Sequence, residues 1–190
     1  LPGEAGNGPI HAPEVIHVTT RSKKPFTLLH NDVYDLHFDR NGQMWVALYL
    51  GGINVIQHPL CEEQRVLSYR HDPSVAATLS DNRVRCFLED HEGNIWIGTS
   101  NGLNVVEQAY GAADEKYFSS IIRPGSHEGI TYNDVIALCE DSDSCIWVGT
   151  LGGGVNRLIK SGPELTFQIQ AFSRDEGLSS NMVLGLAEET

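Results

Sequence analysis

The sequence predicts an all-β fold made of repeated four-stranded antiparallel sheets, and three observations support this prediction. The chain aligns with itself at a period near 50 residues, which is the length of one β-propeller blade. Each repeat contains short apolar runs separated by turns rich in Gly, Asn and Asp. No segment shows the 3.6-residue apolar spacing of a helical repeat. We therefore expect a β-propeller fragment of about three complete blades, with one orphan strand at each end.

The repeat is defined by residue types that keep one register. All three Trp are at the same repeat position, and each is 51 residues from the next. A Val opens each unit at that interval and recurs after 48 residues; an Asn precedes it by two residues, and an acid follows it by six. These recurring residues are Trp45, Trp96 and Trp147; Val33, Val84, Val135 and Val183; Asn31, Asn82, Asn133 and Asn181; and Asp39, Asp90, Asp141 and Glu189.

Each unit is expected to form four strands in chain order. The first strand begins at the Val and ends in an Asp-x-x-Gly turn, in which Ser144 replaces Gly in the third unit. The second strand carries the Trp, the third follows a Gly-rich turn, and the fourth is the least regular. The expected strands are 33–38, 44–48, 53–57 and 65–69; 84–89, 95–99, 103–107 and 116–121; and 135–140, 146–150, 155–159 and 165–172.

The domain organisation follows from these units. Residues 1–13 are expected to be irregular, and residues 14–190 to form a partial β-propeller. Its blades span about 33–70, 84–122 and 135–173; residues 14–19 resemble the last strand of a preceding blade, and 182–188 the first strand of a following one. Known propellers have at least four blades, so three would expose an apolar flank. Either missing blades of the parent chain or self-association would cover this flank.

The Trp residues are predicted to be core residues between blades and not part of a cofactor site. In the second strand Ile95 and Ile97 face one way, while Trp96 and Gly98 face the other, so both faces are apolar. A blade requires this pattern because each face packs on a neighbouring blade. Gly98 and Gly149 would leave room for that neighbour.

Composition excludes several classes of partner. The chain has 13 basic and 25 acidic residues, a net charge of −12, which disfavours nucleic acid and direct membrane contact. No stretch reaches the roughly 20 apolar residues of a membrane span, and no secretion signal is recognisable at the N-terminus. The four Cys show no CxxC spacing, so zinc is not expected. Cys139 and Cys145 flank a turn: they either pair in an oxidising compartment or stay reduced, and a buried thiol is the simpler interpretation for Cys86 and Cys139.

No catalytic, metal or cofactor site is predicted. The repeated acids Asp39, Asp90 and Asp141 are better explained as turn caps, because equivalent positions in different blades do not converge. The eight His occupy different repeat positions, and neither a nucleophile elbow nor a phosphate-binding loop occurs.

A ligand site is predicted on the face formed by the loops before the first strands and between the second and third strands. Tyr49, Arg83 and Tyr132 vary between repeats there; aromatic rings stack on sugars and Arg pairs with carboxylates. The alternative for each is an ordinary variable surface residue.

These motifs resemble the two-component regulator propeller repeat. The shared pattern is L-x-x-N-x-V, an acid six residues after the Val, then G-x-I-W-I-G-T and G-G-L-N; LSDNRVRCFLEDHEGNIWIGTSNGLNVV matches it best. The first unit departs from it, with Ala47-Leu48 in place of Gly-Thr. The resemblance spans about residues 27–190.

The resemblance implies a periplasmic sensor region of a bacterial membrane receptor, whose output domain is a histidine kinase or a diguanylate cyclase. It also implies a glycan fragment or another small molecule as the ligand. Our first hypothesis is therefore a non-catalytic sensor fragment that regulates a distant output domain. The alternatives are a propeller enzyme of the lyase or hydrolase type and a protein-assembly module.

Overall fold

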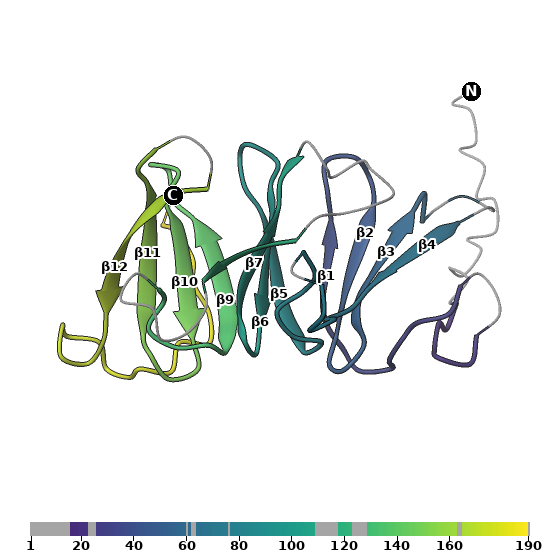
Figure 1. The fold of residues 1–190 in the computed structure, drawn as a ribbon, viewed down its shortest axis with the longest axis horizontal. Helices are drawn as coiled ribbons and strands as arrows, with labels where there is room; N and C mark the ends of the chain where they lie inside the picture. The colour runs from purple at the N-terminus through teal and green to yellow at the C-terminus, as the bar shows by residue number, and fades with distance from the viewer. Residues whose placement is uncertain are drawn as a thin grey trace, which may run out of the picture.

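Three four-stranded sheets stand side by side in the fold (Figure 1). The computed structural model describes residues 16–22, 26–59, 61, 64–75, 77–108, 118–122, 129–162 and 165–189. Blade 1 contains β1 (Val33–Phe38), β2 (Met44–Leu48), β3 (Gly52–Gln57) and β4 (Arg65–Tyr69); blade 2 contains β5 (Val84–Glu89), β6 (Ile95–Thr99), β7 (Gly102–Val106) and β8 (Ser119–Ile122); blade 3 contains β9 (Val135–Glu140), β10 (Ile146–Thr150), β11 (Val155–Lys160) and β12 (Phe167–Phe172).

The strands in each sheet follow chain order and pair antiparallel, which confirms the predicted blades. All first and second strands have the predicted bounds. The third strands differ by one residue at one or both ends: Gly52 and Gly102 already pair with the second strand, and Lys160 still pairs with the fourth. The last strand of blade 2 begins at Ser119, and that of blade 3 begins at Phe167. Residue 116, where the former was expected to begin, lies outside the described residues.

The two terminal segments were expected to be orphan strands at 14–19 and 182–188, but the described residues 16–19 and 182–188 are not strands. Residues 14 and 15 lie outside the described part of the chain. A strand in a sheet needs a ladder of hydrogen bonds to a neighbour, and neither described segment belongs to a sheet. The C-terminal segment nevertheless keeps the repeat register: Val183 donates its N–H to the Thr150 carbonyl (3.0 Å) and packs against Gly149, as Val135 packs against Gly98.

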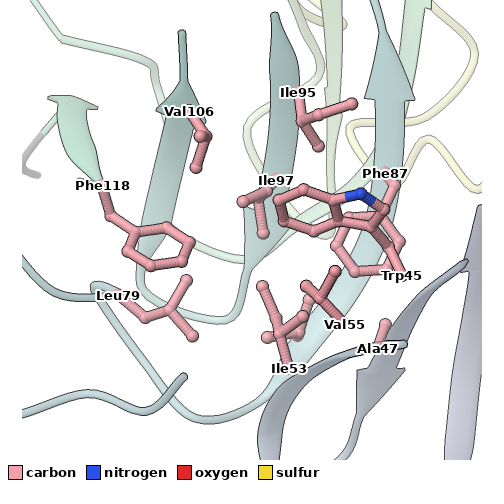
Figure 2. Packing of buried hydrophobic residues seen from close by; sticks show 11 residues of the cluster. Trp45, Ala47, Ile53, Val55, Leu79, Phe87, Ile95, Ile97, Val106 and Phe118 are labelled. Atoms are coloured by element: carbon pink, nitrogen blue, oxygen red, sulfur yellow. The ribbon is translucent and has the colours of Figure 1, made fainter. Parts of the chain in front are cut away.

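The hydrophobic core lies between blades. Side chains of blades 1 and 2 form one cluster, which includes Trp45, Ile53, Phe87 and Ile97 (Figure 2). The ring centroids of Trp45 and Phe87 are 6.0 Å apart in an edge-on contact. Trp96 makes an edge-on contact with the fourth strand of blade 3, where its ring centroid lies 5.5 Å from that of Phe167. The prediction that these two Trp residues are core residues between blades is confirmed.

The second strand has two apolar faces, as predicted. Ile95 and Ile97 belong to the cluster shared with blade 1, whereas Trp96 belongs to the cluster shared with blade 3. A Cβ atom on Gly98 would lie 2.6 Å from the Cys86 sulfur and 2.8 Å from a Val135 methyl carbon. The absence of a side chain at Gly98 therefore lets blade 3 approach closely.

Each repeated Asp caps its turn and also holds the Trp of the same blade. In blade 2, Asp90 Oδ1 accepts the N–H of Asn94 (2.8 Å), and Asp90 Oδ2 accepts the indole N–H of Trp96 (2.8 Å). The bond to the indole was not anticipated from the sequence. The corresponding indole bonds are Trp45–Asp39 at 2.9 Å and Trp147–Asp141 at 2.7 Å.

The repeated Asn residues join neighbouring blades through their backbone. The carbonyl of Asn82 accepts the N–H of Gly52 in the preceding blade (2.9 Å). Gly52 has a φ of 74°, and a Cβ there would lie 2.1 Å from the Tyr69 carbonyl oxygen, so only glycine fits. The same bond recurs twice at 2.8 Å, as Gly102–Asn133 and Gly154–Asn181.

The outer flanks of the three-blade row are more exposed than its interior. Leu36 and Phe38 on β1 are each 56% exposed, whereas Phe87, which occupies the Leu36 position in blade 2, is buried against blade 1. At the other end of the row, Trp147 is only half-buried. Its ring stacks on Phe172 of the same blade at 5.7 Å.

Truncation of Trp96 should destabilise the chain more than truncation of Trp147. Trp96 is 1% exposed and lies between two complete blades, so Trp96→Ala should lower the free energy of unfolding by about 3–5 kcal/mol. Trp147→Ala removes a half-buried ring and should cost less. Urea denaturation of both variants checks this, and equal losses would contradict the wedge role of Trp96.

Addition of one methyl group at Gly98 should separate blades 2 and 3. Gly98→Ala places a Cβ against Cys86 and the Val135 backbone, so we expect a loss of about 1–3 kcal/mol in the free energy of unfolding. Gly185→Ala is the matched control, because its Cβ meets no atom within 4 Å. A Gly98→Ala variant as stable as this control in thermal unfolding would refute the close approach.

Candidate functional site

The predicted binding face is formed by two sets of loops that are hydrogen-bonded to each other. In blade 1 the N–H of Tyr49, after β2, donates to the carbonyl of Asp32, before β1 (3.1 Å). Blades 2 and 3 repeat this bond as Ser100–Arg83 (3.0 Å) and Leu151–Asp134 (2.9 Å). The expectation that these loops share one face is therefore confirmed, and we call this surface the loop face.

A β-bulge opens the first strand of every blade next to the loop face. The register between first and second strands shifts at residues 34, 85 and 136, so each of these is an extra residue without a cross-strand partner. Bulges redirect a side chain out of the regular alternation. The bulged residues are Tyr34, Arg85 and Ile136.

Tyr34, Tyr49, Arg85 and Asp134 form a continuous set of contacts across three blades, which we call the rim cluster. The rings of Tyr34 and Tyr49 stack with centroids 5.5 Å apart and an interplanar angle of 18°. The Arg85 guanidinium lies 5.2 Å from the Tyr34 centroid and 6.0 Å from that of Tyr49. Arg85 also makes a two-point ion pair with Asp134, both distances being 3.1 Å. Tyr34 remains 49% exposed, so part of its surface is free for contact.

Arg83 lies beside the rim cluster but is already engaged. Its guanidinium binds Asp81 at two points, Nε–Oδ1 at 3.1 Å and Nη2–Oδ2 at 3.0 Å. Burial alone would raise the pKa of Asp81, but the hydrogen bonds from Arg83 outweigh it and lower that pKa. The same bonds raise the pKa of Arg83, to which the nearby Tyr49 also contributes. The sequence-based role of Arg83 as a free partner for a carboxylate is therefore not supported by its geometry.

Tyr132 stands apart from Tyr49 and Arg83. It is 46% exposed, and its ring lies over Gly152, where a Cβ would come within 3.1 Å of the ring. Within the described part of the chain, no hydrogen bond, ion pair or ring contact joins Tyr132 to the rim cluster. The structure thus brings together two of the three predicted residues.

Tyr34, Arg85 and Asp134 were not among the predicted site residues. Positions 34 and 85 were assigned to regular strands, in which a side chain faces a neighbouring blade. Their variation between repeats, from Tyr to Arg to Ile, was the available signal, because the position directly before them is Val in every repeat.

The acidic and histidine side chains with described positions do not gather into a metal centre. Asp39, Asp90 and Asp141 each remain in their own turn, bound to the local Trp. Among the residues with described positions, no group of three or more His, Cys, Asp or Glu side chains could hold a metal ion.

Cys139 and Cys145 are both free thiols and do not pair. Cys139 borders a hollow beside Trp147 at the outer flank of blade 3, whereas Cys145 lines a cavity facing blade 2. The two side chains therefore lie on opposite faces of blade 3. Burial raises the pKa of the Cys86 thiol to about 12, which agrees with its expected role as a buried apolar residue.

Comparisons with known proteins agree with this geometry. The family model described as "Two component regulator propeller" matches residues 27–49, 78–101 and 129–152, one segment in each blade. No curated protein has a sequence that matches this chain. The described residues contain no helix that is long and apolar enough to cross a bilayer.

Several solved structures share the fold. The extracellular domain assigned to the hybrid two-component system BT3049 of B. thetaiotaomicron is 28% identical, with a TM-score of 0.64 over 84% of this chain and 19% of that one. PorZ, a surface component of the type-IX secretion system of Porphyromonas gingivalis, is 20% identical, with a TM-score of 0.61 over 83% of this chain and 23% of that one. The extracellular domain of the one-component system BT4673 of B. thetaiotaomicron is 23% identical, with a TM-score of 0.61 over 79% of this chain and 20% of that one.

The chain therefore spans less than a quarter of each of these proteins. Its three blades carry the matched segments at equivalent positions, from the loop before the first strand to the turn after the second. Each of the three blades contains a two-component regulator propeller repeat.

Proposed function

We propose that this chain is part of a non-catalytic sensor region that binds its ligand at the rim cluster. The observation that carries this proposal is the exposed Tyr34 ring, fixed by its stack on Tyr49 and by the Arg85 guanidinium. A fixed aromatic surface needs no reordering when a ligand stacks on it, which lowers the entropic cost of binding. The extracellular location of the BT3049 domain supports a periplasmic position, and the two-component repeats support the control of a distant output domain.

The ligand that fits this cluster best is a neutral saccharide. Arg83 and Arg85 are each held at two points by a carboxylate, so an anionic sugar would have to break an existing ion pair. The carboxylates of Asp81 and Asp134 retain acceptor capacity for sugar hydroxyls, since an ionised carboxylate has about four lone-pair sites. An apolar sugar face on Tyr34 and hydroxyls directed to these acids would complete the contact.

This proposal predicts that neutral oligosaccharides stabilise the chain against heat and that Tyr34 is required. At a ligand concentration 100 times its Kd, binding adds about 2.7 kcal/mol to the stability, which corresponds to several degrees in Tm. Tyr34→Ala should remove this shift because it deletes the stacking surface. Differential scanning fluorimetry with a panel of neutral and sulfated or carboxylated oligosaccharides provides the measurement.

Tyr132→Ala is the matched control, since it removes an equally exposed tyrosine of the loop face outside the rim cluster. The shift should persist in this variant. A shift that survives Tyr34→Ala but disappears in Tyr132→Ala would move the site to blade 3. A preference for the anionic oligosaccharides would contradict the neutral ligand class.

A further inference from the structure

A cavity of about 240 Å³ lies between blades 2 and 3, next to the turns that join their first and second strands. Its apolar wall contains Trp96, Ile146 and Phe167, and its polar wall contains His91 and Glu140. The rim cluster is built on loops at the other ends of these strands. The cavity is therefore separate from the site proposed above.

The equivalent place between blades 1 and 2 is filled by a guanidinium group. Arg40 holds the repeat position of His91, 51 residues earlier. Its Nε pairs with Glu89 (2.5 Å), and its Nη2 donates to the carbonyls of Asp90 (2.8 Å) and His91 (3.2 Å). The guanidinium carbon lies 2.8 Å from the place where a Cβ on Gly93 would be, so the group covers that turn closely.

Blade 3 has acceptors at the positions that bind this guanidinium, but the facing residue of blade 2 is His91 and not Arg. Glu140 and the carbonyl of Asp141 stand at the positions of Glu89 and Asp90, and Ser144 replaces Gly93. Ser144 and Glu140 both line the cavity. The shorter His91 side chain reaches Glu140 with its imidazole and leaves the remaining volume open. The Arg40 guanidinium thus occupies the interface between blades 1 and 2. The interface between blades 2 and 3 keeps a carboxylate, Glu140, with no guanidinium beside it among the described residues.

We propose that this cavity binds a small organic cation, an amine or a guanidine with an apolar body. The charged group would pair with Glu140, in a place shifted from that of the Arg40 guanidinium because Ser144 has a Cβ atom where Gly93 has none. The apolar body would lie against Trp96, Ile146 and Phe167. The His91 imidazole is the group that must leave Glu140. Its side chain is 57% exposed, so it can turn toward solvent.

The charges around the cavity favour a cation. Asp90, Glu92, Glu140 and Asp143 face it, against Lys160 and His91. Lys160 is bound by both carboxylate oxygens of Glu92 at 2.8 Å, and Asp143 is 81% exposed with Arg157 at 3.5 Å. The hydrogen bond that His91 donates to Glu140 raises the pKa of His91, so this carboxylate already stabilises a positive charge beside the cavity.

The test uses probes of similar shape and different charge. Isothermal titration calorimetry on the full chain would compare phenethylamine and phenethylguanidine with 2-phenylethanol and 3-phenylpropionate. The two cations should bind saturably with one site per chain. The neutral and anionic probes should bind at least about tenfold more weakly, because a charge-assisted hydrogen bond is lost. Absence of saturable binding by both cations, or equal affinity for the alcohol, would overturn the proposal.

His91→Arg should abolish this binding, because the longer side chain brings its own guanidinium to Glu140 and competes with the added cation for the cavity. Its Tm should equal or exceed that of the wild-type chain, which separates loss of binding from loss of folding. Glu140→Gln should weaken binding about tenfold or more, since it removes the paired charge. Saturable cation binding that persists unchanged in a folded His91→Arg variant would place the site elsewhere and refute the assignment.

Arg40→His is the control for indirect effects. It changes the matching position between blades 1 and 2, so the cations should still bind to the cavity between blades 2 and 3. If Arg40→His abolishes binding as His91→Arg does, the effect of both variants is a general loosening of the blades and the proposal fails.

Discussion

The structure depends on a hydrogen bond between an aspartate and a tryptophan in each blade. A buried indole N–H without a partner would cost about 1–3 kcal/mol, and the Asp carboxylate provides that partner while it also caps the turn before the Trp strand. One side chain therefore fixes the turn, the strand that follows it and the direction of the ring. Trp147 makes the same bond although it is only half-buried. The pair thus belongs to the single blade and prepares the ring for a neighbour, whether or not that neighbour is a complete sheet.

Positions that repeat and positions that vary have different tasks in this chain. The repeated Asn and Gly residues join blades through backbone bonds, and the small Gly98 admits the next blade. The bulged residues do not take part in joining the blades, because the bulge directs them away from the two packed faces. Tyr, Arg and Ile can therefore occupy one position in successive blades without disturbing the sheets. A repeat protein gains a binding surface in this way while its core stays constant.

The local parts of the structure could be predicted from the sequence, and the contacts between distant residues could not. The first and second strands follow from apolar runs between turn residues, and the burial of Trp45 and Trp96 follows from their register. The bulge at Arg85 arises from a mismatch between two paired strands, which the strand sequence alone does not reveal. The partner of Arg85, Asp134, is 49 residues away in another blade, so the sequence could not show that this guanidinium is already engaged in an ion pair. The terminal segments carry strand sequences, yet strand pairing also requires a neighbour.

In the turns at the blade interfaces, one residue position changes its side chain while its backbone keeps the same hydrogen bond to the next segment. The backbone N–H of Arg40, His91 or Ser142 donates to a Glu on the next segment, at 2.9, 2.8 and 2.8 Å. Because the backbone makes this bond, the side chain at the same position is not needed for it. Arg fills the space at one interface, and His leaves a cavity at the next. The backbone N–H thus keeps this bond at each of the three turns, and the side chain at the same position can differ from one interface to the next.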